Sequence, residues 1–312
     1  SVLVRTKEHA MLVDAGPASA RGLDMGEAAV LPALRALGVN RLDRIVISHG
    51  DNDRAGGLAA LQRGWPTAPS YGPPAWRDAQ AETCLAGQAW QWDGVRFRFL
   101  HPPPLFPYLR NDSSCVLRIE AGGSVALLPG DIGRHVESRL VREQAPSLRA
   151  DLLLAPHHGS DSSSSGDFVA AVQPRWVVYA TGANNRFRLP RASVVRRYRD
   201  VGARDSDTAG SGALEFRLDA DGVHLLSARR QDRPRYWREP LGTGSGYATG
   251  GTGAYQNQVF WLDWSCGGVT SYPAGATVNK SWDAGDGLII TGQVTNITFP
   301  MTTYTTGSYG GD

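Results

Sequence analysis

The feature that most constrains this chain is an alternation, over its first 230 or so residues, of short β-branched runs with segments of helical periodicity. Such an alternation predicts a layered α/β domain. Several of the predicted strands run directly into loops rich in polar residues, and strand ends of this kind are where α/β proteins place functional side chains. Four loops stand out, and they follow the predicted strands 44–48, 124–128, 151–155 and 176–180.

Composition places the chain among ordinary folded proteins. Its 312 residues, 41% hydrophobic and 20% charged, suffice for one large domain and a smaller one. The formal charge of +2 divides into +5 before Leu241 and −3 from there on, where Lys280 is the only basic residue. This surplus tolerates an anionic partner but lacks the concentrated charge of a dedicated nucleic-acid binder.

Cysteine spacing and a change of composition bound the domain organisation. Three cysteines, at positions 84, 115 and 266, form no C-x-x-C pair, and their number and spacing imply no disulfide framework. A Gly-, Thr- and Ser-rich stretch at 241–254 predicts a flexible linker. We therefore expect a first domain over 1–240, this linker, and a small all-β module over 255–312 that is cut off or ragged at its end.

The first polar loop holds the densest group of candidate metal ligands. Its sequence, HGDNDRAGG at 49–57, places an imidazole and carboxylates on alternate positions after a buried strand. Side chains in this arrangement can converge on one cation, because each supplies a lone pair and the carboxylates offset the positive charge. Further candidates at later strand ends are Asp131 and either His157 or His158. Taken alone, these residues also fit solvated loop acids and a helix-capping Asp.

The order of the motifs extends this interpretation. The loop resembles the H-x-H-x-D-H motif of the metallo-β-lactamase fold, in the variant H-x-D-x-D-H-x-G-G of the ComEC family of DNA-internalisation competence proteins. The similarity covers about residues 1–228. Other stretches that resemble this family, in the same order, are LVDAG at 12–16, NDSS at 111–114, LPGDI at 128–132, PHHGS at 156–160 and G-x-x-N-x-F-x-x-P at 182–190.

The resemblance implies an α/β sandwich of two β-sheets with helices outside, and a metal-dependent phosphodiesterase that cuts DNA. By position, it assigns His49 and Asp51 to a first metal site, Asp53 to a second, and Asp131 to the bridging carboxylate. It also implies catalytic roles for Asp53 and Asp131, and Asp53 would orient a water molecule or a ligand. The implied cofactor is a divalent metal, Mn²⁺ or Zn²⁺, which can lower the pKa of bound water from about 15.7 to about 7.

One of two adjacent histidines completes the implied ligand set. Neighbours in an extended chain point to opposite faces, so only one can reach the cation. We expect His157 to be the ligand and His158 to pack or to meet the phosphate during catalysis. Ser160, Asn185 and Arg188 are expected to hold the phosphate.

Two positions depart from the family pattern. Arg54 stands where the family has the last His of its first motif, and Leu189 where it has a His before a Pro. A guanidinium offers no lone pair, so Arg54 cannot be a metal ligand. Either Arg54 supplies its charge to the substrate site of a one-metal nuclease, or the site is inactive and the domain is a non-catalytic module that binds and positions DNA.

The resemblance also carries expectations about partners and location. In the family, this domain accompanies a membrane channel, so the implied partners are DNA and a channel portion absent from this chain. The parent protein is expected in the bacterial inner membrane, with this domain on its outer, periplasmic face. No run here approaches the roughly 18–20 apolar residues of a membrane span, so this part itself is expected to be soluble. Through VFWLDW at 259–264, the tail loosely resembles β-domains of bacterial surface adhesins, and we treat it as appended.

Overall fold

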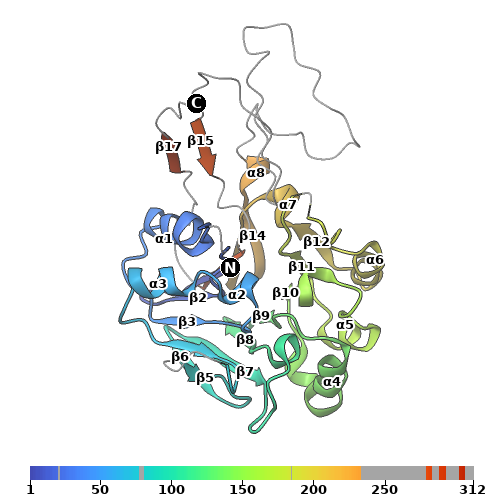
Figure 1. The fold of residues 1–312 in the computed structure, drawn as a ribbon. Coiled ribbons are helices and arrows are strands. Elements are labelled where there is room, and N and C mark those ends of the chain that lie inside the picture. Colours follow the sequence, from blue (N-terminus) through green and yellow to red (C-terminus); the bar gives the residue numbers. More distant parts are fainter. Residues whose placement is uncertain are drawn as a thin grey trace, which may run out of the picture.

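Two β-sheets pack face to face, and helices cover their outer sides (Figure 1). This computed structural model describes residues 1–19, 22–76, 81–183 and 185–232, together with the backbone of the strands 279–282, 288–292 and 302–305. The predicted sandwich of two sheets with outer helices is therefore confirmed. Among the residues described, no helix has both the length and the apolar character required to cross a membrane.

The strands form two large sheets and one small pair. The first large sheet has the order β14-β13-β16-β1-β2-β3-β4-β5, the second has the order β12-β11-β10-β9-β8-β7-β6, and β15 pairs with β17. The bounds are β1 Val2–Arg5, β2 Ala10–Val13, β3 Arg44–Val46, β4 Ser70–Gly72, β5 Glu82–Thr83, β6 Ala89–Trp92, β7 Val95–His101, β8 Val116–Ala121, β9 Ser124–Leu128, β10 Leu152–Leu154, β11 Trp176–Tyr179, β12 Arg204–Asp207, β13 Leu214–Asp219, β14 Gly222–Ala228, β15 Asn279–Trp282, β16 Leu288–Gly292 and β17 Thr302–Thr305.

Helices lie on both outer faces of the sandwich. Those on the first sheet are α1 and α3, and those on the second are α4, α5 and α6 (Figure 1). The bounds are α1 Leu31–Ala36, α2 Asn52–Ala55, α3 Leu58–Gly64, α4 Arg134–Leu148, α5 Gly166–Val172, α6 Ala192–Asp200, α7 Thr208–Ser211 and α8 Arg229–Asp232. A π-helical turn, Gly26–Val30, leads directly into α1.

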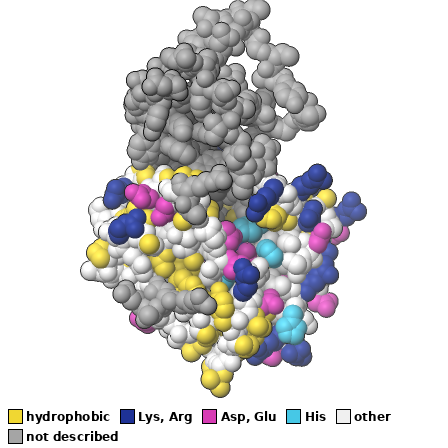
Figure 2. Space-filling view, viewed as in Figure 1, with side chains coloured by type: hydrophobic (Ala, Val, Ile, Leu, Met, Phe, Trp, Pro, Cys, Tyr) yellow, Lys and Arg dark blue, Asp and Glu magenta, His cyan; other side chains and the backbone are white. Residues whose placement is uncertain are grey.

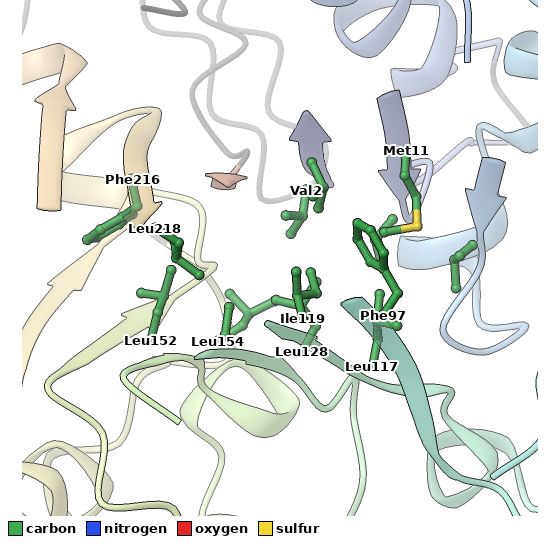
Figure 3. Packing of buried hydrophobic residues seen from close by; sticks show 14 of the residues in the cluster. Val2, Met11, Phe97, Leu117, Ile119, Leu128, Leu152, Leu154, Phe216 and Leu218 are labelled. Carbon is green, nitrogen blue, oxygen red and sulfur yellow. The ribbon is translucent and has the colours of Figure 1, made fainter. Parts of the chain in front are cut away.

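The side-chain alternation of the strands creates three layers of core. Val2 and Val4 of β1 belong to the cluster between the sheets, whereas Leu3 packs in the cluster beneath α1 and α3. In β10, Leu152 enters the central cluster and Leu153 the cluster beneath the helices of the second sheet. Successive residues of a strand point to opposite faces, so strands buried on both faces read as continuous apolar runs. Figure 3 shows the central cluster, in which both sheets contribute side chains.

A strand from the C-terminal part joins the first sheet. β16 lies between β1 and β13 and runs parallel to both, with Leu288 level with Val2 and with Leu214. β15 and β17 form a separate antiparallel pair. The predicted linker at 241–254 lies outside the described residues, as does most of the predicted module over 255–312, so the proposed boundary near residue 240 remains a prediction.

His101 ends β7 as a buried side chain. Its Nε2–H donates to the Asp112 carbonyl at 2.8 Å, and burial lowers the pKa of His101 to about 4. In the unfolded chain this histidine has its ordinary pKa near 6.5, so below that pH the unfolded chain takes up a proton that the folded chain does not, and protonation favours unfolding. Between pH 7.5 and pH 5 we expect this group to cost about 2 kcal/mol of stability. Urea unfolding of His101→Gln should show a pH dependence weaker than that of the wild type by this amount; equal slopes would contradict the burial effect.

Candidate metal centre

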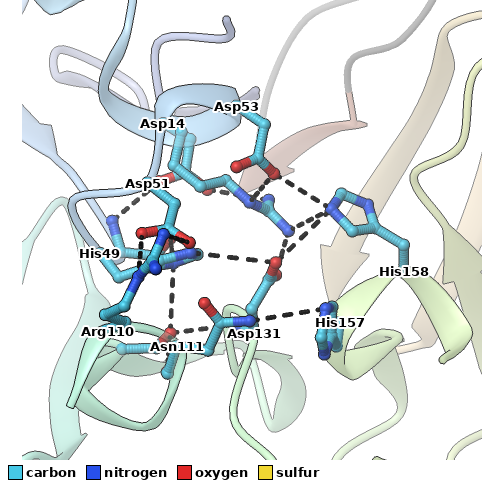
Figure 4. A network of polar contacts seen from close by, with 12 residues as sticks. Asp14, His49, Asp51, Asp53, Arg110, Asn111, Asp131, His157 and His158 are labelled. Carbon is cyan, nitrogen blue, oxygen red and sulfur yellow. Dashed lines mark hydrogen bonds and ion pairs between the residues drawn. The ribbon is translucent and has the colours of Figure 1, made fainter. Parts of the chain in front are cut away.

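Polar loops from both sheets meet at one end of the sandwich (Figure 4). The loop after β3 carries Asp51, and α2, which follows it, carries Asp53 and Arg54. Asp131 follows β9, and the 3-10 turn Pro156–Gly159 follows β10. Because β9 and β10 are parallel neighbours, their C-terminal ends lie at the same edge of the second sheet.

Arg54 occupies the centre of this end, and its side chain is buried. Nη1 donates to Asp14 Oδ2 at 3.0 Å, Nη2 donates to Asp131 Oδ1, and Nε lies 3.3 Å from Asp53 Oδ2. His158 Nε2 is 2.9 Å from Nη2. One guanidinium thus holds together three carboxylates from separate parts of the chain, two of them buried.

The charges fix the ionisation states of this group. Burial alone would raise the pKa of the Asp131 carboxyl, but Arg54 outweighs burial and holds that pKa below its usual value. Burial opposes the charged form of Asp53 as well, yet the hydrogen bond from His158 and the charge of Arg54 bring its pKa well below the usual range. Burial alone would lower the pKa of Arg54, and the surrounding carboxylates raise it instead. At neutral pH the cluster therefore consists of carboxylates around a guanidinium.

Three of these side chains have the spacing of a cation site. Ligand atoms of Asp53, Asp131 and His158 all lie within 4.8 Å of one another. The guanidinium of Arg54 contacts all three. The positive charge that would attract these ligands is therefore already supplied by the protein at this position.

His49 lies on the other side of Asp131 and is almost completely buried. Its Nδ1 lies 3.3 Å from Ser48 Oγ and 3.4 Å from Ser114 Oγ. Its Nε2 is buried without a hydrogen-bond partner among the described residues, and it faces Asp131 Oδ2 at 4.0 Å. A buried nitrogen without a partner is costly, and here it faces the oxygen of Asp131 that does not bind Arg54.

Asp51, expected in the first metal site, is the N-cap residue of α2. Its carboxylate accepts two hydrogen bonds, both at 3.2 Å, from Nε and Nη2 of Arg110. Arg110 begins a 3-10 turn after an exposed proline-rich loop, and its own side chain is exposed. Nothing in the spacing of the sequence indicates this contact, since the two residues are 59 positions apart.

The two adjacent histidines do not lie in an extended chain. Both have left-handed backbone angles, with φ of 48° at His157 and 56° at His158, so the argument from alternating faces does not apply. His158 reaches the carboxylates, with Nε2 at 3.4 Å from Asp53 Oδ2 and 3.6 Å from Asp131 Oδ2. His157 instead places Nδ1 3.0 Å from Ser162 Oγ and Nε2 3.5 Å from Asn111 Nδ2. Burial lowers the pKa of His157, which favours its neutral form.

The residues expected to hold phosphate lie beside this turn. Ser160 Oγ is 3.0 Å from Ser162 Oγ. The Asn185 amide bonds within its own loop, donating to the carbonyls of Gly182 and Leu189 and accepting from the Leu189 N–H. Arg188 is exposed and has a positive φ of 54°.

Two further residues hold the side chains of the site in place. Ser114 accepts a hydrogen bond from the Asp131 N–H at 3.0 Å and lies close to His49. Asp14 accepts from the Ser48 N–H at 2.8 Å and also pairs with Arg54. Both residues belong to stretches that match the family pattern, and that match was the available signal.

The expectation that the cysteines imply no disulfide is wrong. Cys84 and Cys115 form a disulfide, with their Cα atoms 6.0 Å apart. Both are buried in the central cluster between the sheets. Cys115 also donates its N–H to the Ser48 carbonyl at 2.8 Å. This hydrogen bond holds the segment that carries Ser114 against the loop that carries His49.

Comparison with known proteins agrees with the motif order. The family model described as the metallo-beta-lactamase superfamily matches residues 1–182. Competence protein ComA of Neisseria gonorrhoeae is 40% identical over 230 residues, which cover 73% of this chain and 32% of that protein. ComE operon protein 3 of Bacillus subtilis is 28% identical over 208 residues, covering 62% of this chain and 27% of that protein. The solved structure of the metallo-beta-lactamase fold protein YhfI from Bacillus subtilis aligns with a TM-score of 0.39 and 15% identity, over 64% of this chain and 84% of that one.

The chain thus spans only 32% and 27% of the lengths of these two curated relatives. ComA is named as a competence protein, which confirms the resemblance drawn from the motifs. The family model covers more than half of the chain, including the loop of His49 and the turn of His158. The chain belongs to the metallo-beta-lactamase superfamily.

Proposed function

We propose that this domain is a metal-dependent DNA phosphodiesterase within a DNA-uptake protein, and that it uses one divalent cation beside the fixed charge of Arg54. The 40% identity to a relative named as a competence protein supports a role in DNA uptake. The observation that carries the proposal is the buried, unpartnered Nε2 of His49 facing Asp131 Oδ2. An imidazole nitrogen and a carboxylate oxygen that face each other in this way fit a divalent cation.

The residues present fit one cation better than two. His49 and Asp131 would hold it, and Mn²⁺ and Zn²⁺ both suit these donors. Asp51, the third residue proposed for this site, pairs with Arg110 in the structure. When bound, such an ion supplies an activated water at neutral pH and offsets the negative charge of the phosphate. In the cluster of Asp53, Asp131 and His158 the guanidinium of Arg54 already contacts each ligand. A second cation does not fit beside that charge.

The chain's own groups have distinct roles in this proposal. Asp53 has a strongly lowered pKa and an exposed side chain, so at neutral pH it is a carboxylate that can orient an attacking water but is a weak proton acceptor and cannot donate a proton. Arg54 keeps its proton and gives the rear of the site a constant positive charge. His158, partly exposed beside Asp53, is proposed to meet the phosphate. Arg188 and Ser160, on the same side, are proposed to bind the neighbouring phosphate.

A specific observation favours a second candidate, a module that positions DNA without cutting it. The charge of Arg54 is shared among Asp14, Asp53 and Asp131, so much of it is offset within the protein. A site of this kind could retain the fold and a DNA-binding rim without the cation. The two candidates differ in whether DNA cleavage depends on a bound ion.

Asp131→Asn tests the proposal. The wild-type chain should bind about one Mn²⁺ by calorimetry and cut linear DNA in a reaction abolished by chelator. The variant should lose ion binding and cut about 10³-fold more slowly, because the charge shared by His49 and Arg54 is gone. Asp200→Asn, an exposed carboxylate at the end of α6, is the matched control and should behave as wild type.

His49→Asn separates a lost ion site from a disturbed ion-pair cluster, since His49 makes no contact with Arg54 among those described. It too should abolish ion binding and cleavage. A wild-type chain that binds DNA, binds no ion and shows no chelator-sensitive cleavage would establish the positioning module. Two ions per chain would contradict the role given to Arg54.

A further inference from the structure

The loop 181–191 stands directly over the His158 turn. At its start, the Ala180 carbonyl lies 2.5 Å from His158 Nδ1, and at its end the Arg191 N–H donates to the Gly159 carbonyl at 3.0 Å. Gly159 packs so closely against Pro190 that an added Cβ would lie 2.7 Å from the proline ring. Both ends of the loop are therefore fixed to the turn that delivers His158 to the carboxylates.

Within this loop, Phe187 is held out from the protein. Its exposed fraction is 59%, among the largest of the hydrophobic side chains described. The Asn185 amide makes three hydrogen bonds across the base of the loop, and these hold its shape. Arg186 lies over the ring, with its guanidinium carbon 4.7 Å from the ring centroid. An exposed aromatic ring on a well-bonded loop costs little entropy when a flat ligand packs on it.

The opposite rim of the site also combines apolar and basic side chains. Tyr108 Oη accepts a hydrogen bond from the Gly50 N–H at 3.1 Å, and Arg110 pairs with Asp51. In the same loop Leu105 is 99% exposed and Leu109 is 50% exposed. Figure 2 shows acidic and histidine side chains meeting at the surface, with basic side chains nearby and a hydrophobic area extending away from them. The site is thus bordered by cations and by apolar surface, rather than by cations alone.

This combination distinguishes between forms of DNA. A duplex presents its phosphates and keeps its bases stacked inside, so it can bind basic side chains but has no free base face to stack on an exposed aromatic ring. A single strand offers free base faces, which stack on aromatic side chains while arginines follow the backbone. We propose that Phe187 is a base-stacking residue that makes this site prefer single-stranded DNA, with Arg186 and Arg188 contacting the adjacent backbone. This inference rests on the proposed function for the identity of the ligand as DNA.

Binding measured without cleavage tests the inference independently of catalysis. Fluorescence anisotropy with a labelled 20-nucleotide single strand and the matching duplex, in chelator, should show tighter binding of the single strand by the wild-type chain. Phe187→Ala should weaken single-strand binding about 5- to 160-fold, the range for loss of one stacked base, and leave duplex binding unchanged. Phe187→Trp should retain the preference.

Controls separate stacking from general loss of apolar surface or charge. Leu226→Ala removes an exposed hydrophobic side chain on β14 and should change neither affinity. Arg188→Ala should weaken both forms and reduce the salt dependence of binding. Equal losses for both forms in Phe187→Ala, no loss, or no measurable binding by the wild type would each overturn the inference. Normal single-strand preference in a chain that cuts no DNA would leave the inference intact and reject only the proposed cleavage.

Discussion

Replacing Arg54 with Met is expected to lower the free energy of unfolding by about 3–5 kcal/mol, the usual cost of breaking a buried ion pair from one side. Methionine has similar length but no charge, so Asp14 and Asp131 remain buried without their cation. Urea unfolding at pH 7.5 measures the loss. Arg63→Met, which removes an exposed arginine paired with Glu27, is the control and should cost less than about 1 kcal/mol.

The pH dependence gives this prediction its sign. In the wild type, Arg54 keeps the pKa of Asp131 low, so this stabilisation is present above the unfolded pKa near 3.9 and is lost as the pH falls through the lower folded value. In Arg54→Met, burial without a partner raises the carboxyl pKa values, so protonation relieves the penalty. The difference in stability between the two proteins should therefore shrink as the pH falls from 7.5 towards 4. A constant difference would show that lost packing, rather than charge, is responsible.

Arg54→His extends the experiment to the metal. An imidazole at this position adds a ligand to Asp53, Asp131 and His158, so Mn²⁺ or Zn²⁺ should bind where the guanidinium was. The variant should take up a second ion and recover stability on ion addition, by about 2.7 kcal/mol at a hundred times the dissociation constant. Ion uptake unchanged from wild type would mean that Arg54 does not occupy a cation position.

Loss of the disulfide between Cys84 and Cys115 is the second large effect expected. The bond closes a loop of sequence separation 31, and the entropy of an open loop of this size corresponds to about 3–4 kcal/mol. Cys84→Ala/Cys115→Ala should lose this stability, measured by denaturant unfolding in the absence of reductant. Reductant should destabilise the wild type and leave the double variant unchanged.

A thiol count checks the premise directly. The denatured, unreduced wild-type chain should react with one equivalent of thiol reagent, from Cys266, and the reduced chain with three. Three reactive thiols before reduction would mean that the pair does not form in solution. Loss of the bond should also affect the site, since Cys115 is hydrogen-bonded to Ser48 and follows Ser114, and we expect weaker ion binding in the double variant.

Much of the fold could be predicted because strand alternation and motif order are local properties of a sequence. The sequence alone shows the apolar runs of β1, β2 and β10 and the polar loops that follow β3, β9 and β10. The disulfide was not, because pairing depends on two distant strands placing their Cα atoms 6.0 Å apart. The same holds for the contact of Arg110 with Asp51. The roles given to individual site residues remain proposals.

The histidines show a different limit. The expectation for His157 depended on an extended backbone after β10, and the chain instead makes a tight left-handed turn there. A β-strand followed by Pro gives no indication of this turn. The structure brings His158 to Asp53 and Asp131, a result of backbone geometry that residue types alone do not encode.

In the turn at His157 and His158, the stability of the fold and the chemistry of the site favour different residues. Left-handed backbone angles cost a non-glycine residue about 1 kcal/mol or more each, and this chain adopts them at two successive positions that both carry imidazoles. Glycine would adopt the same angles with little strain, yet it has no side chain to present to a carboxylate or a phosphate. At these two positions, a residue that relieves the local strain has no imidazole. Selection for a more stable domain alone would therefore favour a chain without these two histidines.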